Sequence, residues 1–184
     1  MKKIFSILVF ALVAIACENE VVFNDPGFQA RKDNRVWRGD LTSGDYNPTD
    51  PAVPNTGSVT ITSFKGFETT TITFPIVLTI PITSLNAQTY TYGYNPTEPS
   101  LDDEISASYT FTDGGTALEY VTGLGFNTER EDPGNLEIVI NKWDPEKRVI
   151  SGTFKFNAKY QGESTLAPDN VNFQEGNFYN IPVF

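Results

Sequence analysis

Apolar and polar residues alternate along most of the chain after about residue 27. The longest run has an apolar residue at every second position: Ile72, Phe74, Ile76, Leu78, Ile80 and Ile82. A period of two predicts a β-strand with one buried face. Pro75 and Pro81 lie between these positions and exclude a helix, since each would cost about 3 kcal/mol in a helix interior. Because proline cannot donate a ladder hydrogen bond, we expect this strand to lie at a sheet edge, to bend, or to be shared between two sheets.

Two hairpins are expected from similar patterns. Residues 28–38 form two short apolar-containing runs about Asp33-Asn34, a pair that tolerates the positive φ of a tight turn. Phe28, Ala30 and Trp37 would then share the core side. In the second hairpin, Ile138 opposes Phe154 and Leu136 opposes Phe156 only if the turn is the three residues 145–147, so the apolar pattern sets the register.

Other segments complete the predicted fold. Residues 105–111 alternate in the same way, whereas residues 42–57 show no period and are expected to form a loop. No window of ten or more residues after position 17 has a convincing helical period. Roughly nine or ten short strands with frequent turns predict an all-β fold, an antiparallel two-sheet β-sandwich of jelly-roll-like form, with a barrel as the alternative.

The N-terminal residues have the pattern of an export signal. Lys2 and Lys3 precede a stretch, residues 4–16, in which only Ser6 is polar, and this stretch is short for a permanent membrane span. It ends in Ala14-Ile15-Ala16-Cys17, which resembles the lipobox of bacterial lipoproteins. The resemblance implies cleavage between Ala16 and Cys17 and a diacylglyceryl group on the Cys17 thiol. The alternative is an ordinary signal peptide with Cys17 as an incidental thiol.

The expected domain organisation follows from this signal. Residues 1–16 are a lipoprotein signal peptide, 17–26 a lipidated tether and 27–184 a single β-sandwich domain. The mature chain has 184 − 16 = 168 residues and a formal charge of (13 − 2) − 23 = −12. Such acidity argues against binding nucleic acid or anionic membrane surfaces by charge attraction. With one cysteine, no intrachain disulfide can form.

Three segments of the mature chain resemble an uncharacterised lipoprotein family of the Bacteroidota type: Phe28-Gln29-Ala30 to Trp37, Ile150 to Phe156, and Val171 to Ile181. The resemblance implies a β-rich domain of unknown function behind a lipobox and an envelope location, most simply the outer membrane. It supplies no activity and no catalytic residues. Glycan capture by many lipoproteins of such bacteria suggests, by analogy alone, a carbohydrate-binding role.

Little in the sequence points to catalysis. The chain contains no histidine, which removes histidine-assisted nucleophilic catalysis, histidine zinc sites and the commonest general base. Asp102-Asp103-Glu104 and Glu129-Arg130-Glu131-Asp132 could gather calcium, but neither has the spacing of a known calcium loop, and solvated loops are the favoured interpretation. We therefore expect no catalytic residue, no resident metal and no cofactor other than the covalent lipid.

Aromatic residues are the remaining candidates for ligand contact. Tyr90, Tyr92 and Tyr94 alternate on one strand face and could stack against sugar rings, although period-two aromatics are also ordinary core residues. Trp143 is expected on the face opposite Ile138 and Ile140, either as an exposed ligand anchor or in contact with another loop at the rim.

The leading expectation is thus a non-enzymatic, lipid-anchored binding or structural module of the cell envelope. Its partners would be the membrane, through the lipid, and a glycan or an envelope protein. The alternatives are a carbohydrate-binding accessory of a glycan-uptake system and, third, a glycoside hydrolase-like enzyme, which would need two carboxylates across a cleft. The sequence leaves open which face of the membrane carries the domain.

Overall fold

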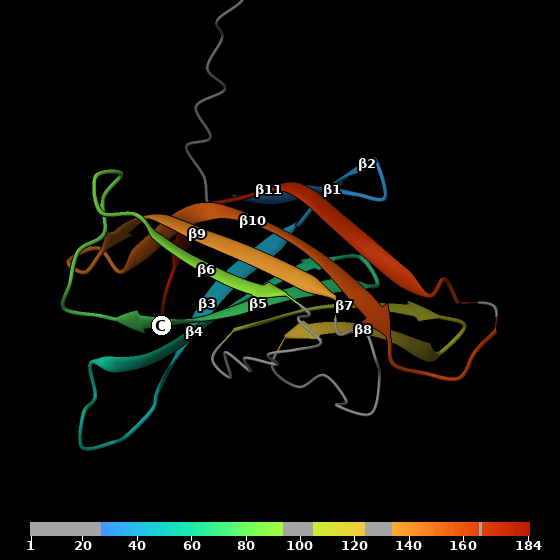
Figure 1. The fold of residues 1–184 in the computed structure, drawn as a ribbon, viewed down its shortest axis with the longest axis horizontal. Coiled ribbons are helices and arrows are strands. Elements are labelled where there is room, and N and C mark those ends of the chain that lie inside the picture. The colour runs from blue at the N-terminus through green and yellow to red at the C-terminus, as the bar shows by residue number, and fades with distance from the viewer. Residues whose placement is uncertain (1–26, 94–104, 124–133, 166) are drawn as a thin grey trace, which may run out of the picture.

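The computed structural model describes residues 27–93, 105–123, 134–165 and 167–184 (Figure 1). Their secondary structure consists of strands joined by turns and short connections, and none of these residues belongs to a helix long and apolar enough to cross a membrane. The strands are, in chain order, β1 (Gly27–Lys32), β2 (Arg35–Arg38), β3 (Leu41–Pro48), β4 (Thr56–Lys65), β5 (Glu68–Val77), β6 (Gln88–Gly93), β7 (Ser106–Asp113), β8 (Thr116–Gly123), β9 (Asn135–Asp144), β10 (Val149–Tyr160) and β11 (Asn170–Pro182).

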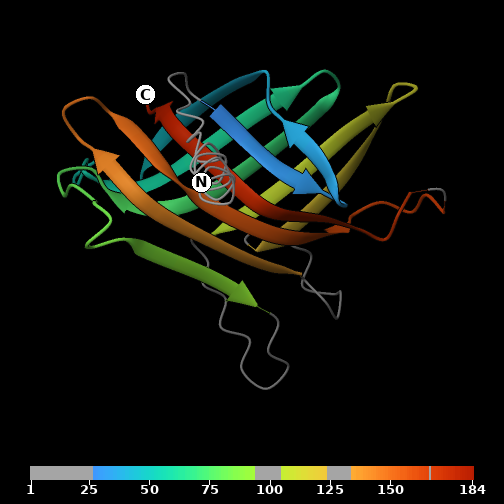
Figure 2. The ribbon, with the colours of Figure 1, turned by 90° about the horizontal axis from the view of Figure 1, so that it is seen from above.

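All of these strands belong to one antiparallel sheet. Its order is β2-β1-β11-β10-β8-β7-β5-β4-β3, with β9 paired to β10 and β6 paired to β9. The sheet curls into a half-barrel, so that β1, β9, β10 and β11 pass over β3, β4, β5, β7 and β8 (Figures 1 and 2). The predicted all-β class is confirmed. The two-sheet jelly-roll arrangement is not confirmed, because backbone pairing continues from one layer into the other.

The continuity depends on the length of β10. Its residues from Val149 to Asn157 pair with β9, and its last two, Lys159 and Tyr160, pair with Val121 and Tyr120 of β8. One long strand therefore carries the sheet around the curl. At the other end of the curl, the C-terminus reaches β3, where the Phe184 amide donates to the Gly44 carbonyl oxygen at 2.9 Å.

The core fills the space between the two layers with aromatic side chains. Phe28 stacks on Phe154 and Phe156 stacks on Phe173, each with ring centroids 4.6 Å apart. Such offset contacts add to the free energy gained by burying the ring surface. The largest fully buried side chains come from both layers: Trp37, Trp143, Phe28, Phe74, Phe156, Phe173, Phe178, Ile61, Ile72, Ile82, Ile105 and Ile138.

The first predicted hairpin is confirmed and the predicted 42–57 loop is wrong in part. Asp33 and Asn34 form the turn with φ of 48° and 65°, and Ala30 pairs with Trp37 as expected. Most of the first half of the supposed loop is strand β3. The sequence conceals it because its core-facing position is Gly44, against which the Val183 side chain packs. Glycine there supplies no apolar signal.

The long alternating run 72–82 is not one strand. Strand β5 ends at Val77, and Ile82 makes an isolated antiparallel bridge to Trp143. Pro75 lies opposite Ser58 of β4, while the pairing of β5 with β7 stops at Thr73. Strand β5 pairs with β4 and with β7, so it is not an edge strand, and Pro75 lies beyond its last pair with β7.

The β9–β10 hairpin has the predicted register but a different turn. Ile138 pairs with Phe154 and Leu136 with Phe156, yet Asp144 pairs with Val149, which leaves a four-residue turn. A β-bulge compensates, since Lys142 faces Ser151 and Ile140 faces Gly152, with Asn141 unpaired between them. The extra residue in the turn and the extra residue in the strand cancel.

We expect Gly152→Ala to destabilise the fold. A Cβ at this position would lie 2.1 Å from the Val139 carbonyl oxygen and 2.5 Å from the Phe178 ring, so the backbone or the ring must move. The free energy of unfolding, measured with urea, should fall by about 1–3 kcal/mol. Lys155→Ala, an exposed position on the same strand, should change it by less than about 1 kcal/mol. Equal effects of the two substitutions would contradict the close packing at Gly152.

Candidate functional site

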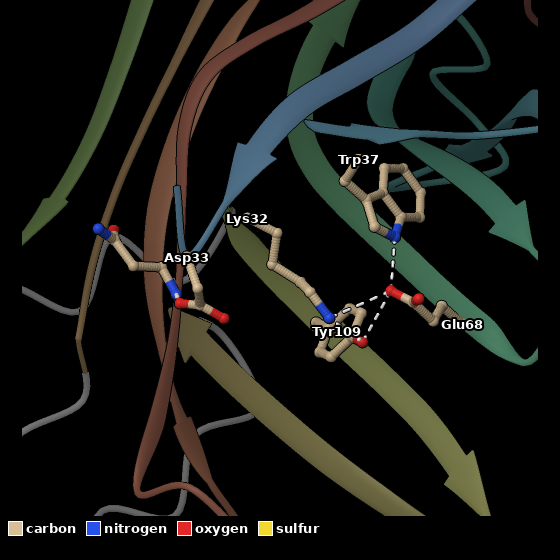
Figure 3. A network of polar contacts seen from close by, with 6 residues as sticks. Lys32, Asp33, Trp37, Glu68 and Tyr109 are labelled. Atoms are coloured by element: carbon tan, nitrogen blue, oxygen red, sulfur yellow. Dashed lines mark hydrogen bonds and ion pairs between the residues drawn. The ribbon is translucent and has the colours of Figure 1, made fainter. Parts of the chain in front are cut away.

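Within the part of the chain that the structure describes, a cluster of polar contacts joins four elements at one end of the half-barrel (Figure 3). Lys32 is the last residue of β1, Trp37 lies in β2, Glu68 is the first residue of β5 and Tyr109 lies in β7. In the sheet order, the β1–β2 hairpin and the β5–β7 pair are far apart, so the curl of the sheet brings them together. We call these four residues the Glu68 cluster.

One carboxylate oxygen is the centre of the Glu68 cluster. Glu68 Oε2 accepts hydrogen bonds from Trp37 Nε1 at 2.7 Å, from the Tyr109 hydroxyl at 2.8 Å and from Lys32 Nζ at 3.2 Å. Lys32 Nζ also lies 2.5 Å from the Tyr109 hydroxyl oxygen and 4.3 Å from the centre of its ring. Trp37 and Tyr109 are buried, and the Lys32 and Glu68 side chains remain about a quarter and a fifth exposed.

The ionisation of these groups is shifted away from neutral pH. Burial acts to raise the pKa of Glu68, but the Tyr109 hydrogen bond and the Lys32 charge outweigh it, and the pKa lies below its ordinary value. Burial, followed by the hydrogen bond to Glu68, raises the pKa of Tyr109 well above its ordinary value. A general base or acid works best with a pKa near the operating pH. The pKa of Glu68 is lowered and the pKa of Tyr109 is raised, so both move away from neutral pH.

The geometry therefore fits a structural role for the Glu68 cluster. A charged acceptor with three donors ties the β1–β2 hairpin to β5 and β7. Asp33, on the other side of Lys32 in Figure 3, ties the hairpin to β11, because its carboxylate accepts a hydrogen bond from the Asn172 backbone amide at 3.0 Å. Sequence reasoning did not find this cluster, because Glu68 is 31 residues from Trp37 and 41 from Tyr109 and belongs to no motif.

Trp143 lies in the core, so the face predicted for it, opposite Ile138 and Ile140, is wrong. The bulge at Asn141 shifts the alternation by one residue and turns Trp143 to the side of Ile138 and Ile140. Its indole Nε1 donates to the Leu78 carbonyl oxygen at 2.8 Å. This hydrogen bond joins Trp143 to the segment that follows β5, and the exposed-anchor interpretation has no support in this arrangement.

Tyr90 and Tyr92 also face the core side. Both are half-buried and pack against the hydrophobic core, and the Tyr90 ring stacks on Phe74 at 6.3 Å between centroids. The Tyr90 hydroxyl lies 2.9 Å from the Pro75 carbonyl oxygen and 2.7 Å from Gln88 Oε1. Their predicted use as a sugar-stacking surface has no support in this arrangement. Tyr94 lies outside the described residues.

A surface hollow lies at the end of β10 and the connection from β10 to β11. It is lined by Lys159, Tyr160, Gly162, Glu163, Ser164, Thr165 and Asp169. Within the described ranges, no three carboxylate or thiol groups come together as a metal site. The acidic segments considered for calcium, residues 102–104 and 129–132, lie outside the described part of the chain, as do Ala16 and Cys17.

The Glu68 cluster predicts a pH-dependent stability difference. Because the pKa of Glu68 is lowered in the folded state, its contribution is present above the pKa of the unfolded chain and is lost as pH falls through the folded value. Glu68→Gln should lower the free energy of unfolding at pH 7 by about 1–3 kcal/mol, as expected for weakened hydrogen bonds to a charged group. The difference between the two proteins should shrink below about pH 4.3.

The matched control for this prediction is Glu137→Gln. Glu137 also pairs with a lysine, Lys155, at 3.0 Å, but on the partly exposed outer surface. Such a pair is worth about 0–1 kcal/mol. A Glu68→Gln effect no larger than that of Glu137→Gln, or one that does not vary between pH 7 and pH 3, would show that the cluster does not hold the hairpin.

Trp143→Ala should cost about 3–5 kcal/mol in the free energy of unfolding, because it leaves a large cavity and removes the contact with Leu78. Lys142→Ala, at the preceding exposed position, should cost no more than about 0.5 kcal/mol. Urea unfolding measures both. A small effect at Trp143 would mean that the indole is not buried.

The comparisons with known proteins give a family and no further relative. A family described as a domain of unknown function (DUF6252) matches residues 24–182. No curated protein and no solved structure matches this chain. The match spans every described strand of the half-barrel, and the chain belongs to the DUF6252 family of β-rich domains.

Proposed function

We propose that this chain is a lipid-anchored protein of the bacterial cell envelope and that its β-domain is a non-enzymatic binding or structural module. In this proposal residues 1–16 are removed as a signal peptide, Cys17 carries the lipid and residues 17–26 tether the domain. The lipid is sufficient for stable attachment, since two or more acyl chains hold a protein stably at a membrane whereas one binds marginally.

The single observation that carries the proposal is the position of the only cysteine. Cys17 directly follows Ala14-Ile15-Ala16 at the end of the apolar stretch that begins after Lys2-Lys3. Charged head, apolar stretch and small residues before a cleavage point are the parts of an export signal. A cysteine that served only as a buried core residue would have no reason to lie directly after the cleavage point of an export signal.

The division of the chain supports the same interpretation. The first described strand begins at Gly27 and the family match begins at residue 24, both downstream of Cys17. Ten residues of tether, 17–26, can span at most about 33–36 Å when extended. The domain would thus stay within a few tens of ångströms of the bilayer that holds the lipid.

A role other than catalysis is supported by the chemistry of the chain. The sequence has no histidine. The carboxylate at the centre of the Glu68 cluster has a lowered pKa and three hydrogen-bond donors on one oxygen. The similarity to Bacteroidota-type lipoproteins supports the outer membrane as the location. The carbohydrate-binding alternative receives no support from Trp143, Tyr90 and Tyr92, because these three side chains are engaged in packing.

Metabolic labelling with a fatty acid tests the anchor. The wild-type chain, expressed in a bacterium with a lipoprotein pathway, should incorporate label and lose residues 1–16. Cys17→Ser should abolish incorporation, because the serine hydroxyl does not form the thioether. Asn19→Ser, which keeps the thiol, should retain it. Label retained by Cys17→Ser, or intact mass showing Met1 and an unmodified thiol in the wild type, would overturn the proposal.

A further inference from the structure

One corner of the half-barrel carries exposed large apolar side chains. Val36 of β2 is 75% exposed, Leu41 at the start of β3 is 67% exposed, and Phe64 and Phe67 at the β4–β5 turn are 44% and 79% exposed. Leu41 and Phe64 are direct cross-strand partners on the outer face. The Asp40 amide donates to the Phe64 carbonyl oxygen at 2.7 Å, which holds the β2–β3 connection against the tip of β4.

The same corner is rich in positive charge. Five of the 13 − 2 = 11 cationic residues that follow residue 16 belong to it: Arg31, Lys32, Arg35, Arg38 and Lys65. Lys65 Nζ lies 6.0 Å from the Trp37 ring, and Arg31 is the cross-strand partner of Val36. The acidic residues of this corner are Asp33, Asp40 and Glu68, and Glu175 of β11 lies 3.9 Å from Arg31. The formal charge of the corner with Glu175 included is 5 − 4 = +1.

The rest of the mature chain has the opposite sign. With −12 in total and +1 at the corner, the remainder carries −12 − 1 = −13. A negatively charged surface therefore repels most of the domain and attracts this corner, which orients the molecule even though the net charge opposes binding. Exposed phenylalanine and leucine beside arginine are the side chains that enter the interface of a bilayer whose headgroups are anionic.

We propose that this corner, formed by the β1–β2 hairpin and the β4–β5 turn, docks on the anionic phosphate headgroups of the bilayer in which the Cys17 lipid is inserted. The inference rests on the proposed anchor and adds the orientation of the domain. Strand β1 is the first element after the tether and leads directly into the corner. The tether is long enough to allow this contact, and it raises the local concentration of a weak site.

A fluorescence assay with a substituted tether tests the docking independently of lipidation. The chain from residue 17, with Cys17→Ser and a polyhistidine tag at its N-terminus, contains every described strand and binds vesicles through nickel-chelating lipid. An environment-sensitive fluorophore is attached to Val36→Cys at the corner. The same fluorophore on Leu85→Cys, 97% exposed at the opposite end of the half-barrel, is the control. Vesicles are phosphatidylcholine with or without phosphatidylglycerol.

The emission at position 36 should shift to shorter wavelength only with phosphatidylglycerol, and the emission at position 85 should not shift. Arg35→Gln with Arg38→Gln should lower the ratio of docked to undocked protein by about fivefold per cation. Lys142→Gln with Lys155→Gln, which removes the same charge elsewhere, should leave the ratio unchanged. Salt at about 1 M should abolish docking of the labelled protein that keeps Arg35 and Arg38, since screening then acts within about 3 Å.

Equal shifts at positions 36 and 85, or no shift at 36 on anionic vesicles, would overturn the proposal and leave the corner to another partner. A fluorescence shift at position 36 that does not change with the arginine substitutions would also overturn the proposal, because docking would then not depend on charge. The nickel-lipid tether replaces the Cys17 lipid in these experiments. A negative result therefore counts against the docking corner alone, while loss of the anchor is decided by fatty-acid labelling.

Discussion

The fold depends on the length of β10. Twelve residues allow this strand to pair with β11 along one edge and, along the other, with β9 first and then with β8. Because both ladders belong to one strand, the two layers of the half-barrel are a single sheet that bends around its core. The space inside the bend is filled by buried apolar side chains, among them stacked phenylalanine rings from β1, β10 and β11, and their burial stabilises the curled sheet.

A curled sheet still has ends that must be joined, and polar contacts do this at two places. Near the C-terminus, the backbone of Phe184 bonds to Gly44 of β3. At the opposite end of the barrel, Glu68 gathers Trp37, Tyr109 and Lys32. A partly buried carboxylate is costly unless its oxygens have donors. The lowered pKa of Glu68 indicates that these donors more than compensate for its burial. The Glu68 cluster therefore holds the β1–β2 hairpin against β5 and β7.

The Glu68 cluster connects the fold to the proposed function. In the proposed arrangement the β1–β2 hairpin follows the tether, and any load from the lipid anchor would reach the domain through this hairpin. Strand β1 of the hairpin pairs with β11, and Trp37 of β2 donates a hydrogen bond to Glu68 of β5. A firmly held hairpin can present Val36 and its neighbouring arginines in a fixed orientation, which a frayed terminal strand could not do.

The sequence by itself determined the strand class, the β1–β2 hairpin with its Asp33-Asn34 turn, and the pairing of Ile138 with Phe154, because each depends on a period of two or a local turn. Its account of the N-terminal residues stays a prediction. Tertiary structure decided the rest. The bulge at Asn141 reverses the side on which Trp143 lies, Gly44 conceals a strand because it has no side chain, and Glu68 meets donors far away in the chain. These features depend on contacts between distant segments, and hydrophobic alternation carries no information about which distant segments meet.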